Sequence, residues 1–132
     1  MTITILIIGL SFIAVAFILK EENAKFLLSG YNTMKKQERE KFNIKAFIPF
    51  FKSFHIFLGI SVMLLAFIIK FLINDKASNF SLIAYPLLAY IYFFKKSDKF
   101  YLDKPPITNK ILILVLSFIT ILIVIKMLIN QA

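Results

Sequence analysis

Four long apolar stretches dominate this chain of 132 residues and constrain its fold more than any other feature. They run over about 2–19, 54–73, 80–94 and 111–129. The hydrocarbon core of a bilayer is about 30 Å thick, and a helix needs about 20 apolar residues to cross it. The sequence therefore predicts an all-α protein, a four-helix transmembrane bundle in which residues 1–132 form a single integral membrane domain.

The composition agrees with a membrane protein. Hydrophobic residues make up 60% of the chain, well above the roughly 45–50% of a soluble domain. The net charge of +9 would also suit nucleic acid, but the lysines lie beside the apolar stretches. There they are typical of topology signals and of contacts with anionic lipid. We expect the lipid bilayer and anionic lipid head groups as partners, and no nucleic acid. The chain has no cysteine, which excludes disulfides and thiolate chemistry.

The basic residues also predict the orientation. Segments 20–52 and 95–110 are rich in Lys and Arg, whereas Lys76 is the only basic residue of the turn 74–79. Short loops of this kind stay in the cytoplasm. Both basic segments fall on one side of a four-span model, so we predict that they are cytoplasmic and that both termini lie outside. Residues 1–10 contain no Lys or Arg, so we expect an uncleaved first helix rather than a signal peptide.

The first polar segment favours a cytoplasmic helical hairpin over 20–45, between spans one and two. Good helix formers follow Lys20, so we expect the first helix to continue to Gly30, the left-handed residue that would end it. Asn32 or Thr33 would then cap a second helix over 34–42. Neither forms a capping box, because no Glu or Gln stands three residues later.

Two prolines and one short stretch complicate the remaining spans. Pro49 lies where the chain returns to the bilayer and should end or kink a helix there. The third stretch, 80–94, corresponds to only about 22 Å of helix, so it crosses a bilayer only if flanking polar residues join it. The residues concerned are Ser78, Asn79, Lys95 and Lys96. Pro86 should be tolerated inside this span, with a kink.

Residues that carry chemistry are scarce. His55 is the only histidine, and we expect an interfacial residue there more than a ligand or a proton relay. Every acidic residue lies in a loop, which disfavours a pump or a proton-coupled carrier. Lys70 and Lys126 should snorkel to the outer surface, the alternative being a site for a lipid head group or an anionic partner. We predict no catalytic, cofactor-binding or metal-binding residues, and no enzyme. No span shows a small-xxx-small pair, so close glycine-type dimerisation has no visible signature.

The residues after the first stretch resemble a known family. Gly30-Tyr31-Asn32-Thr33-Met34, followed by the charged segment 35–42, is similar to the Ala-Gly-Tyr-Asn-Thr-Met signature of domain of unknown function 3784. Ser29 replaces the usual Ala, and Lys35 stands where Ser often follows. The resemblance covers about 5–100 and implies a small bacterial protein of the inner membrane, without supplying a function. A fainter likeness exists to bacteriocin-immunity membrane proteins.

These observations lead to a functional hypothesis. We expect a non-enzymatic component that presents its basic cytoplasmic hairpin to a membrane-protein partner or to anionic lipid. The alternative is an immunity-type or small-solute transport protein. The candidate interaction residues are Gly30, Tyr31, Asn32, Thr33, Lys35, Lys36 and Arg39. A purely structural turn explains the first four equally well, because Gly ends helices and Asn or Thr begins them.

Overall fold

The computed structural model describes residues 1–28, 31, 34–105 and 107–131. Within these ranges the protein is all-α, as expected, and its only β-type pairing is an isolated bridge. The elements are α1 (Thr2–Ile18), α2 (Ala24–Leu27), α4 (Lys36–Glu40), α5 (Ile44–Leu72), α6 (Asp75–Ser97), the 3-10 helix η1 (Asp98–Phe100) and α7 (Ile107–Gln131).

All four apolar stretches form helices, and three of the described helical segments are long and apolar enough to cross a membrane. These segments are Ile44–Leu72, Asp75–Phe100 and Ile107–Met127. The helix of the first stretch, α1, is also apolar but has only 17 residues. The structure is thus compatible with a membrane protein.

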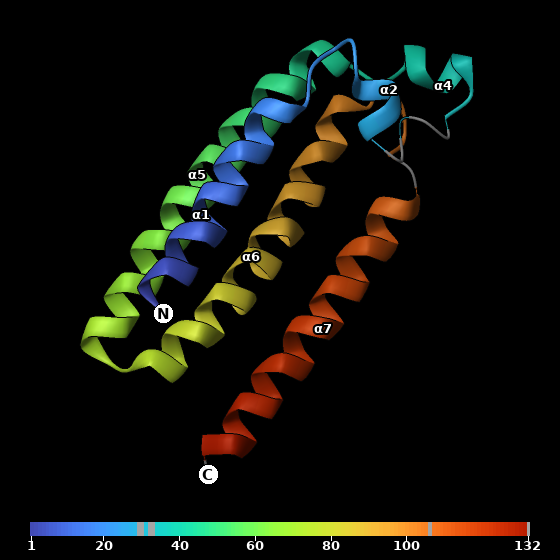
Figure 1. The fold of residues 1–132 in the computed structure, drawn as a ribbon. Helices are drawn as coiled ribbons and strands as arrows, with labels where there is room; N and C mark the ends of the chain where they lie inside the picture. Colours follow the sequence, from blue (N-terminus) through green and yellow to red (C-terminus); the bar gives the residue numbers. More distant parts are fainter. Residues whose placement is uncertain (29–30, 32–33, 106, 132) are drawn as a thin grey trace.

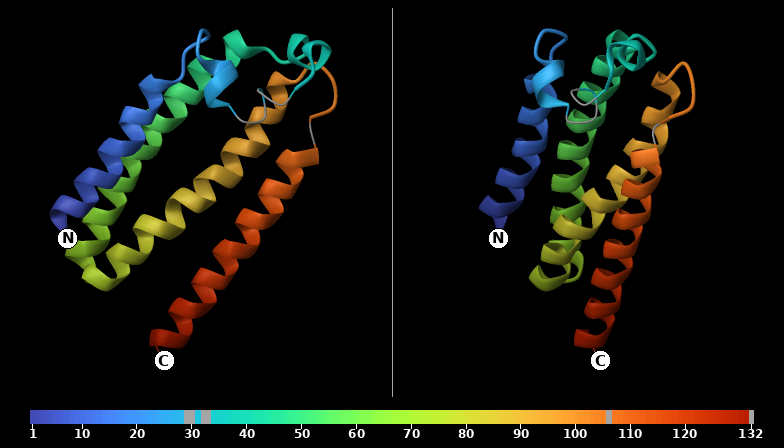
Figure 2. Two further views of the ribbon diagram at one scale, coloured as in Figure 1. Left: turned by 45° about the vertical axis from the view of Figure 1, so that its right-hand side comes forward. Right: turned by 90° about the vertical axis from the view of Figure 1, so that its right-hand side faces the viewer.

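The four long helices lie in a row rather than in a closed bundle. Helix α5 packs against α1 and α6, and α6 packs against α7 (Figure 1). The left view of Figure 2 shows the helices side by side, with α1 at one edge of the row and α7 at the other. The N-terminal end of α1 and the C-terminal end of α7 lie at one end of the molecule, while α2 and α4 lie at the other (Figure 1). The two basic segments therefore meet at the same end.

The expected continuation of the first helix past Lys20 is wrong, because α1 ends at Ile18. The side chain of Asn23 folds back on this end. Its Nδ2 donates to the carbonyl of Ile18 at 2.7 Å, and its Oδ1 accepts from the backbone N–H of Lys20 at 2.7 Å. Asn competes in this way with helical hydrogen bonds. A turn and the four-residue helix α2 replace the first arm of the expected hairpin.

Of the two expectations for Pro49, a helix end is wrong, since α5 runs through it, whereas a kink stays a prediction. The helix begins earlier than predicted because Asn43 caps it, with Oδ1 accepting from the N–H of Ala46 at 3.1 Å. Phe47 is buried within the same turns. This packing offsets the missing hydrogen bond of Pro49, as neighbouring elements often do for proline in apolar helices.

The third stretch acquires the length it lacked. The polar turn is confined to Ile73 and Asn74, because Asn74 Oδ1 accepts from the N–H of Ala77 at 2.8 Å and caps α6. The residues proposed to lengthen the span, 78–79 and 95–96, all belong to this helix. Pro86 is buried inside it. The prediction that these flanking polar residues would have to join the helix is confirmed.

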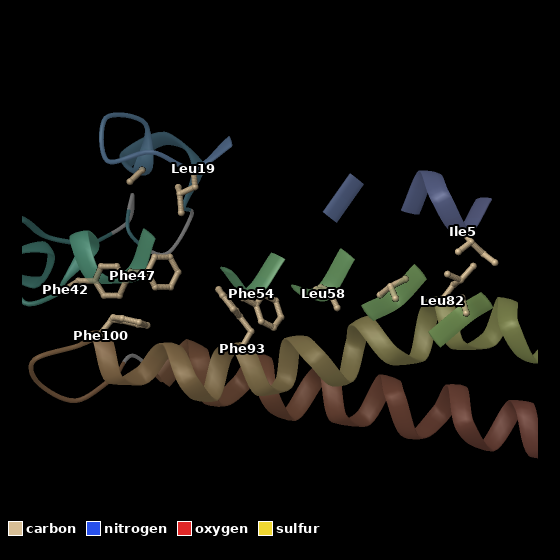
Figure 3. Packing of buried hydrophobic residues seen from close by; sticks show 12 residues of the cluster. Ile5, Leu19, Phe42, Phe47, Phe54, Leu58, Leu82, Phe93 and Phe100 are labelled. Carbon is tan, nitrogen blue, oxygen red and sulfur yellow. The ribbon is translucent and has the colours of Figure 1, made fainter. Parts of the chain in front are cut away.

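Close backbone contacts hold the row together. Gly9 of α1 faces Gly59 of α5, and a Cβ built on Gly59 would lie 2.5 Å from the Gly9 carbonyl oxygen. A close glycine-type contact thus exists between two helices of the same chain, although neither helix carries a small-xxx-small pair. Between α5 and α6, the Ser78 hydroxyl donates to the Ala66 carbonyl at 2.8 Å. Apolar side chains fill the rest of these interfaces (Figure 3).

Candidate interaction surface

The two basic segments are joined to each other at the loop end of the molecule. Phe42 and Tyr101 form an antiparallel β-bridge. On either side of it, the N–H of Asn43 donates to the Phe100 carbonyl and the N–H of Leu102 donates to the Lys41 carbonyl, each at 2.8 Å. We call the described residues 19–28, 31, 34–43 and 98–105 the loop layer. Segments about 60 residues apart in sequence thus form one surface.

An aromatic cluster packs the loop layer against the ends of helices α5 and α6. Phe42 is 7% exposed, and its ring centroid lies 4.7 Å from that of Tyr101 and 5.2 Å from that of Phe47. Phe47 meets Phe100 edge-on at 5.5 Å (Figure 3). Phe50 of α5 stacks on Phe93 of α6 at 5.3 Å. The loop layer is therefore anchored on the helices by buried rings.

The structure describes four of the seven predicted interaction residues. Tyr31 is half-buried, with its ring centroid 5.7 Å from that of Phe42. Lys35 and Lys36 are exposed. Arg39 is half-buried, and its Nε donates to the Met34 carbonyl at 3.0 Å. Gly30, Asn32 and Thr33 lie outside the described residues, so the expected left-handed glycine and the expected caps at Asn32 or Thr33 stay predictions.

The second helix of the polar segment is shorter than predicted. Helix α4 covers five residues, and its N-cap is Lys35. The carboxylate of Glu38 accepts a hydrogen bond from the Lys35 backbone N–H at 3.0 Å. This is the half of a capping box that a Glu at the third helical position supplies. The sequence pattern favours Asn32 or Thr33 as the cap, because Lys is not among the residues preferred at this position.

A shallow hollow of about 340 Å³ brings two of the predicted residues together with residues that the sequence did not single out. Tyr31 and Arg39 line it, with additional walls from Glu40, Phe42, Asn43, Ile44, Lys45 and Leu102. The β-bridge between Phe42 and Tyr101 brings Leu102 to the wall of the hollow. No local sequence pattern predicts this bridge. Lys35 and Lys36 do not line the hollow.

The pKa values of two titratable side chains in the loop layer, Lys41 and Tyr101, are shifted. The side-chain hydrogen bond between Lys41 and Asp103, together with the carboxylate's charge, raises the pKa of Lys41. Partial burial raises the pKa of Tyr101, and the charge of Asp98 adds to this effect. Asp98 also accepts a hydrogen bond from Asn109 Nδ2 at 2.7 Å, which ties the start of α7 to the loop layer.

His55 is not the interfacial residue expected, because it is 2% exposed between α5 and α6. Its Nδ1 lies 2.8 Å from the Phe51 carbonyl, and its Nε2 lies 3.1 Å from the Tyr90 hydroxyl. The hydroxyl of Tyr85 donates to Ser61 at 2.8 Å in the same interface. The polar groups between these helices therefore pair with one another. Near the opposite end, Lys70 Nζ donates to the Thr2 hydroxyl at 3.0 Å.

Among the residues that the structure describes, no group of three His, Asp or Glu side chains is placed to hold a metal ion.

Comparison with known proteins gives one match. The family model described as Domain of unknown function (DUF3784) matches residues 6–101. The match begins inside α1, includes both residues of the β-bridge, Phe42 and Tyr101, and ends before α7. No curated protein and no solved structure matches the chain.

Proposed function

The chain belongs to the family of domain of unknown function 3784, and on this premise we propose that it is a non-enzymatic multi-pass protein of a bacterial inner membrane. In this proposal all four long helices cross the bilayer. The loop layer lies on the cytoplasmic side, where it is presented to a membrane-protein partner or to anionic lipid. Both termini lie outside.

The observation that carries the proposal is the joining of the two basic segments. The bridge between Phe42 and Tyr101 gathers them into one surface at one end of the helices. Side chains of Lys35, Lys36 and Lys45 are exposed on or beside this surface. Clustered lysines beside apolar spans favour the cytoplasmic side and attract anionic lipid. Presentation of a basic surface needs no further chemistry than this.

The orientation is tested with single cysteines, because the natural chain contains none. Exposed positions at the two ends serve best, namely Glu40 and Lys104 at the loop end and Asp75 at the other. In intact cells, an impermeant thiol reagent should label Asp75→Cys and spare Glu40→Cys and Lys104→Cys. Permeabilised cells should give labelling at all three. Labelling of the loop-end cysteines alone in intact cells would reverse the orientation.

A protein partner is tested through the predicted interaction residues. If the turn is a contact site, Tyr31→Ala and Asn32→Ala should abolish copurification of a partner crosslinked in native membranes, while abundance and topology stay unchanged. Charge removal at Lys35, Lys36 or Arg39 should weaken the interaction gradually and with salt dependence. Loss of protein abundance before loss of the partner would assign the turn a structural role only.

The immunity or transport alternative would be favoured by unpaired polar groups around a cavity between the helices. The polar side chains between α5 and α6 hydrogen-bond to one another or, in the case of Ser78, to the Ala66 backbone carbonyl instead. The presentation of a basic surface is therefore the function that we propose.

A further inference from the structure

The hollow at the start of α5 combines two cationic side chains with neutral hydrogen-bond donors. Arg39 comes from α4, and Lys45 comes from the first turn of α5. Tyr31 adds a hydroxyl group, and Asn43 adds an amide whose oxygen is already engaged in capping. A guanidinium group suits phosphate because its donors form a planar fork. One carboxylate, that of Glu40, also lines the hollow, and its charge would repel a bound anion.

The Arg39 side chain is positioned before any ligand arrives. Its Nε donates to the Met34 carbonyl, which fixes the guanidinium relative to the backbone. Burial of part of the side chain further restricts it. A held guanidinium loses less conformational freedom on binding than a free surface lysine does. Lys36, by contrast, is exposed and lies outside the hollow.

The length of α5 places the hollow at the depth of lipid head groups. Its 29 residues correspond to about 43 Å of helix. The hydrocarbon core is about 30 Å thick, and a bilayer with its polar regions is about 40–45 Å thick. A helix of this length reaches through both polar regions, so its first turn, with Ile44 and Lys45, lies in one of them. The opposite end of α5 reaches the other.

The walls of the hollow are partly apolar. Phe42, Ile44 and Leu102 line it beside the cations, and Leu102 is 73% exposed. An exposed leucine at head-group depth can contact the glycerol and upper acyl region of a lipid, where apolar and polar groups meet. A soluble anion has no apolar part that could make these contacts. The combination of charge, apolar wall and depth is that of a phospholipid rather than of free phosphate.

We propose that this hollow binds the phosphate of an anionic phospholipid, with Arg39 and Lys45 contacting the phosphate and Leu102 contacting the lipid below it. The assignment deepens the proposed function and rests on its placement of the loop layer at the membrane surface. It names a defined site where that function requires only a basic surface.

The test measures lipid binding to the full-length protein in detergent by native mass spectrometry. Phosphatidylglycerol is titrated as the anionic probe and phosphatidylcholine as the control lipid. Arg39→Gln and Lys45→Gln should each lower the affinity for phosphatidylglycerol about fivefold, the factor that corresponds to about 1 kcal/mol per cation near a head group. Neither should change the affinity for phosphatidylcholine. Glu40→Gln should raise the affinity for phosphatidylglycerol.

The matched control is Lys36→Gln, which removes the same charge from the same short helix but outside the hollow. It should change the affinity less than twofold. Equal losses for Lys36→Gln and Lys45→Gln would overturn the site and leave only diffuse attraction. Arg39→Lys separates charge from fork geometry and should keep only part of the affinity. Lys45→Gln keeps the test valid if Arg39→Gln disturbs α4, since Lys45 is exposed on a long helix.

Two further arms separate the outcomes. Millimolar glycerol phosphate should not displace the lipid, and displacement would assign the hollow to small phosphate compounds instead. Cysteine labelling of the same variants reports the orientation independently of lipid binding. A reversed orientation would overturn the proposed function, whereas correct orientation with equal losses at Lys36 and Lys45 would overturn the site alone.

Discussion

The hydroxyl group of Tyr90 donates a hydrogen bond to Nε2 of His55, with 3.1 Å between the two atoms. The direction follows from the other ring nitrogen. Nδ1 lies 2.8 Å from the Phe51 carbonyl, which can only accept, so Nδ1 carries the hydrogen of the neutral ring. The pair links α5 to α6 within a cluster of aromatic rings. The only histidine of the chain thus serves the packing of two helices.

Removal of either partner of this pair should destabilise the contact between α5 and α6. Tyr90→Phe leaves Nε2 of His55 without a donor, and the loss should be about 0.6–1.7 kcal/mol, the range of hydrogen bonds between apolar helices. A double-mutant cycle with His55→Phe, followed by thermal unfolding in detergent, measures the coupling. Tyr92→Phe is the control, because Tyr92 is 54% exposed. A coupling energy of zero would show that the pair is incidental.

Substitution of Gly59 should loosen the contact between α1 and α5. The Cβ of Gly59→Ala would lie 2.5 Å from the backbone oxygen of Gly9 and 2.6 Å from the Ile13 side chain. Because backbone cannot yield as a flexible side chain does, a loss of about 1–3 kcal/mol is expected. Unfolding in detergent gives the value.

Two comparisons sharpen this prediction. Gly9→Ala should cost less, since the two atoms nearest to its Cβ belong to the flexible Met63 side chain and the closest backbone atom, the Gly59 oxygen, lies at 2.9 Å rather than 2.5 Å. Ala14→Leu enlarges an exposed position of the same helix and should leave stability unchanged. The reverse order of the two glycine variants would contradict the close contact.

Truncation of Phe42 should separate the loop layer from the helices. The ring is 7% exposed and contacts rings from α5 and from the connector after η1. Phe→Ala substitutions in well-packed sites cost about 3–5 kcal/mol. Hydrogen exchange should therefore rise at the backbone N–H groups of Asn43 and Leu102, which the bridge protects. Phe26→Ala, at a ring that is 80% exposed, should leave this exchange unchanged.

Removal of α7 should leave the other three long helices packed. Among the described long helices, α6 is the one against which α7 packs extensively, and most of the surface of α7 is exposed. A chain that ends at Lys104 should therefore retain the helicity of residues 2–100 and the shielding of Val62, which is 2% exposed. Circular dichroism measures the helicity, and labelling of Val62→Cys measures the shielding. The C-terminus would then move to the loop side, which a fluorescent fusion reports. Unfolding of the remainder would show that α6 depends on α7.

The apolar stretches predicted where helices form, because the length and composition of each stretch are properties of neighbouring residues. The helix ends were harder to predict. Asn23, Asn43 and Asn74 set three of them through side-chain hydrogen bonds. Each asparagine is visible in the sequence, but it competes with other polar residues nearby. Pro49 does not end α5, because packing of the surrounding rings outweighs its local preference.

Contacts between distant segments could not be predicted from local patterns. The approach of Gly9 to Gly59 depends on how α1 and α5 cross, and one glycine on each helix forms no repeat. The pairing of Phe42 with Tyr101 depends on where α6 ends relative to the start of α5. The hollow is a product of that pairing, so Tyr31 and Arg39 were singled out from the sequence while Lys45 and Leu102 were not.

The unequal lengths of α1 and α5 have a consequence for the surrounding lipid. The 17 residues of α1 span about 26 Å, several ångströms less than the hydrocarbon core, whereas its neighbour α5 is long enough for the whole bilayer. If α1 crosses the bilayer as we propose, the hydrocarbon layer formed by lipids at the α1 edge of the row would have to be thinner than that at the α7 edge. Such mismatch costs fractions of a kcal/mol per ångström and sorts proteins among membranes of different thickness. A protein with one short edge should prefer thin bilayers, or neighbours that hide that edge.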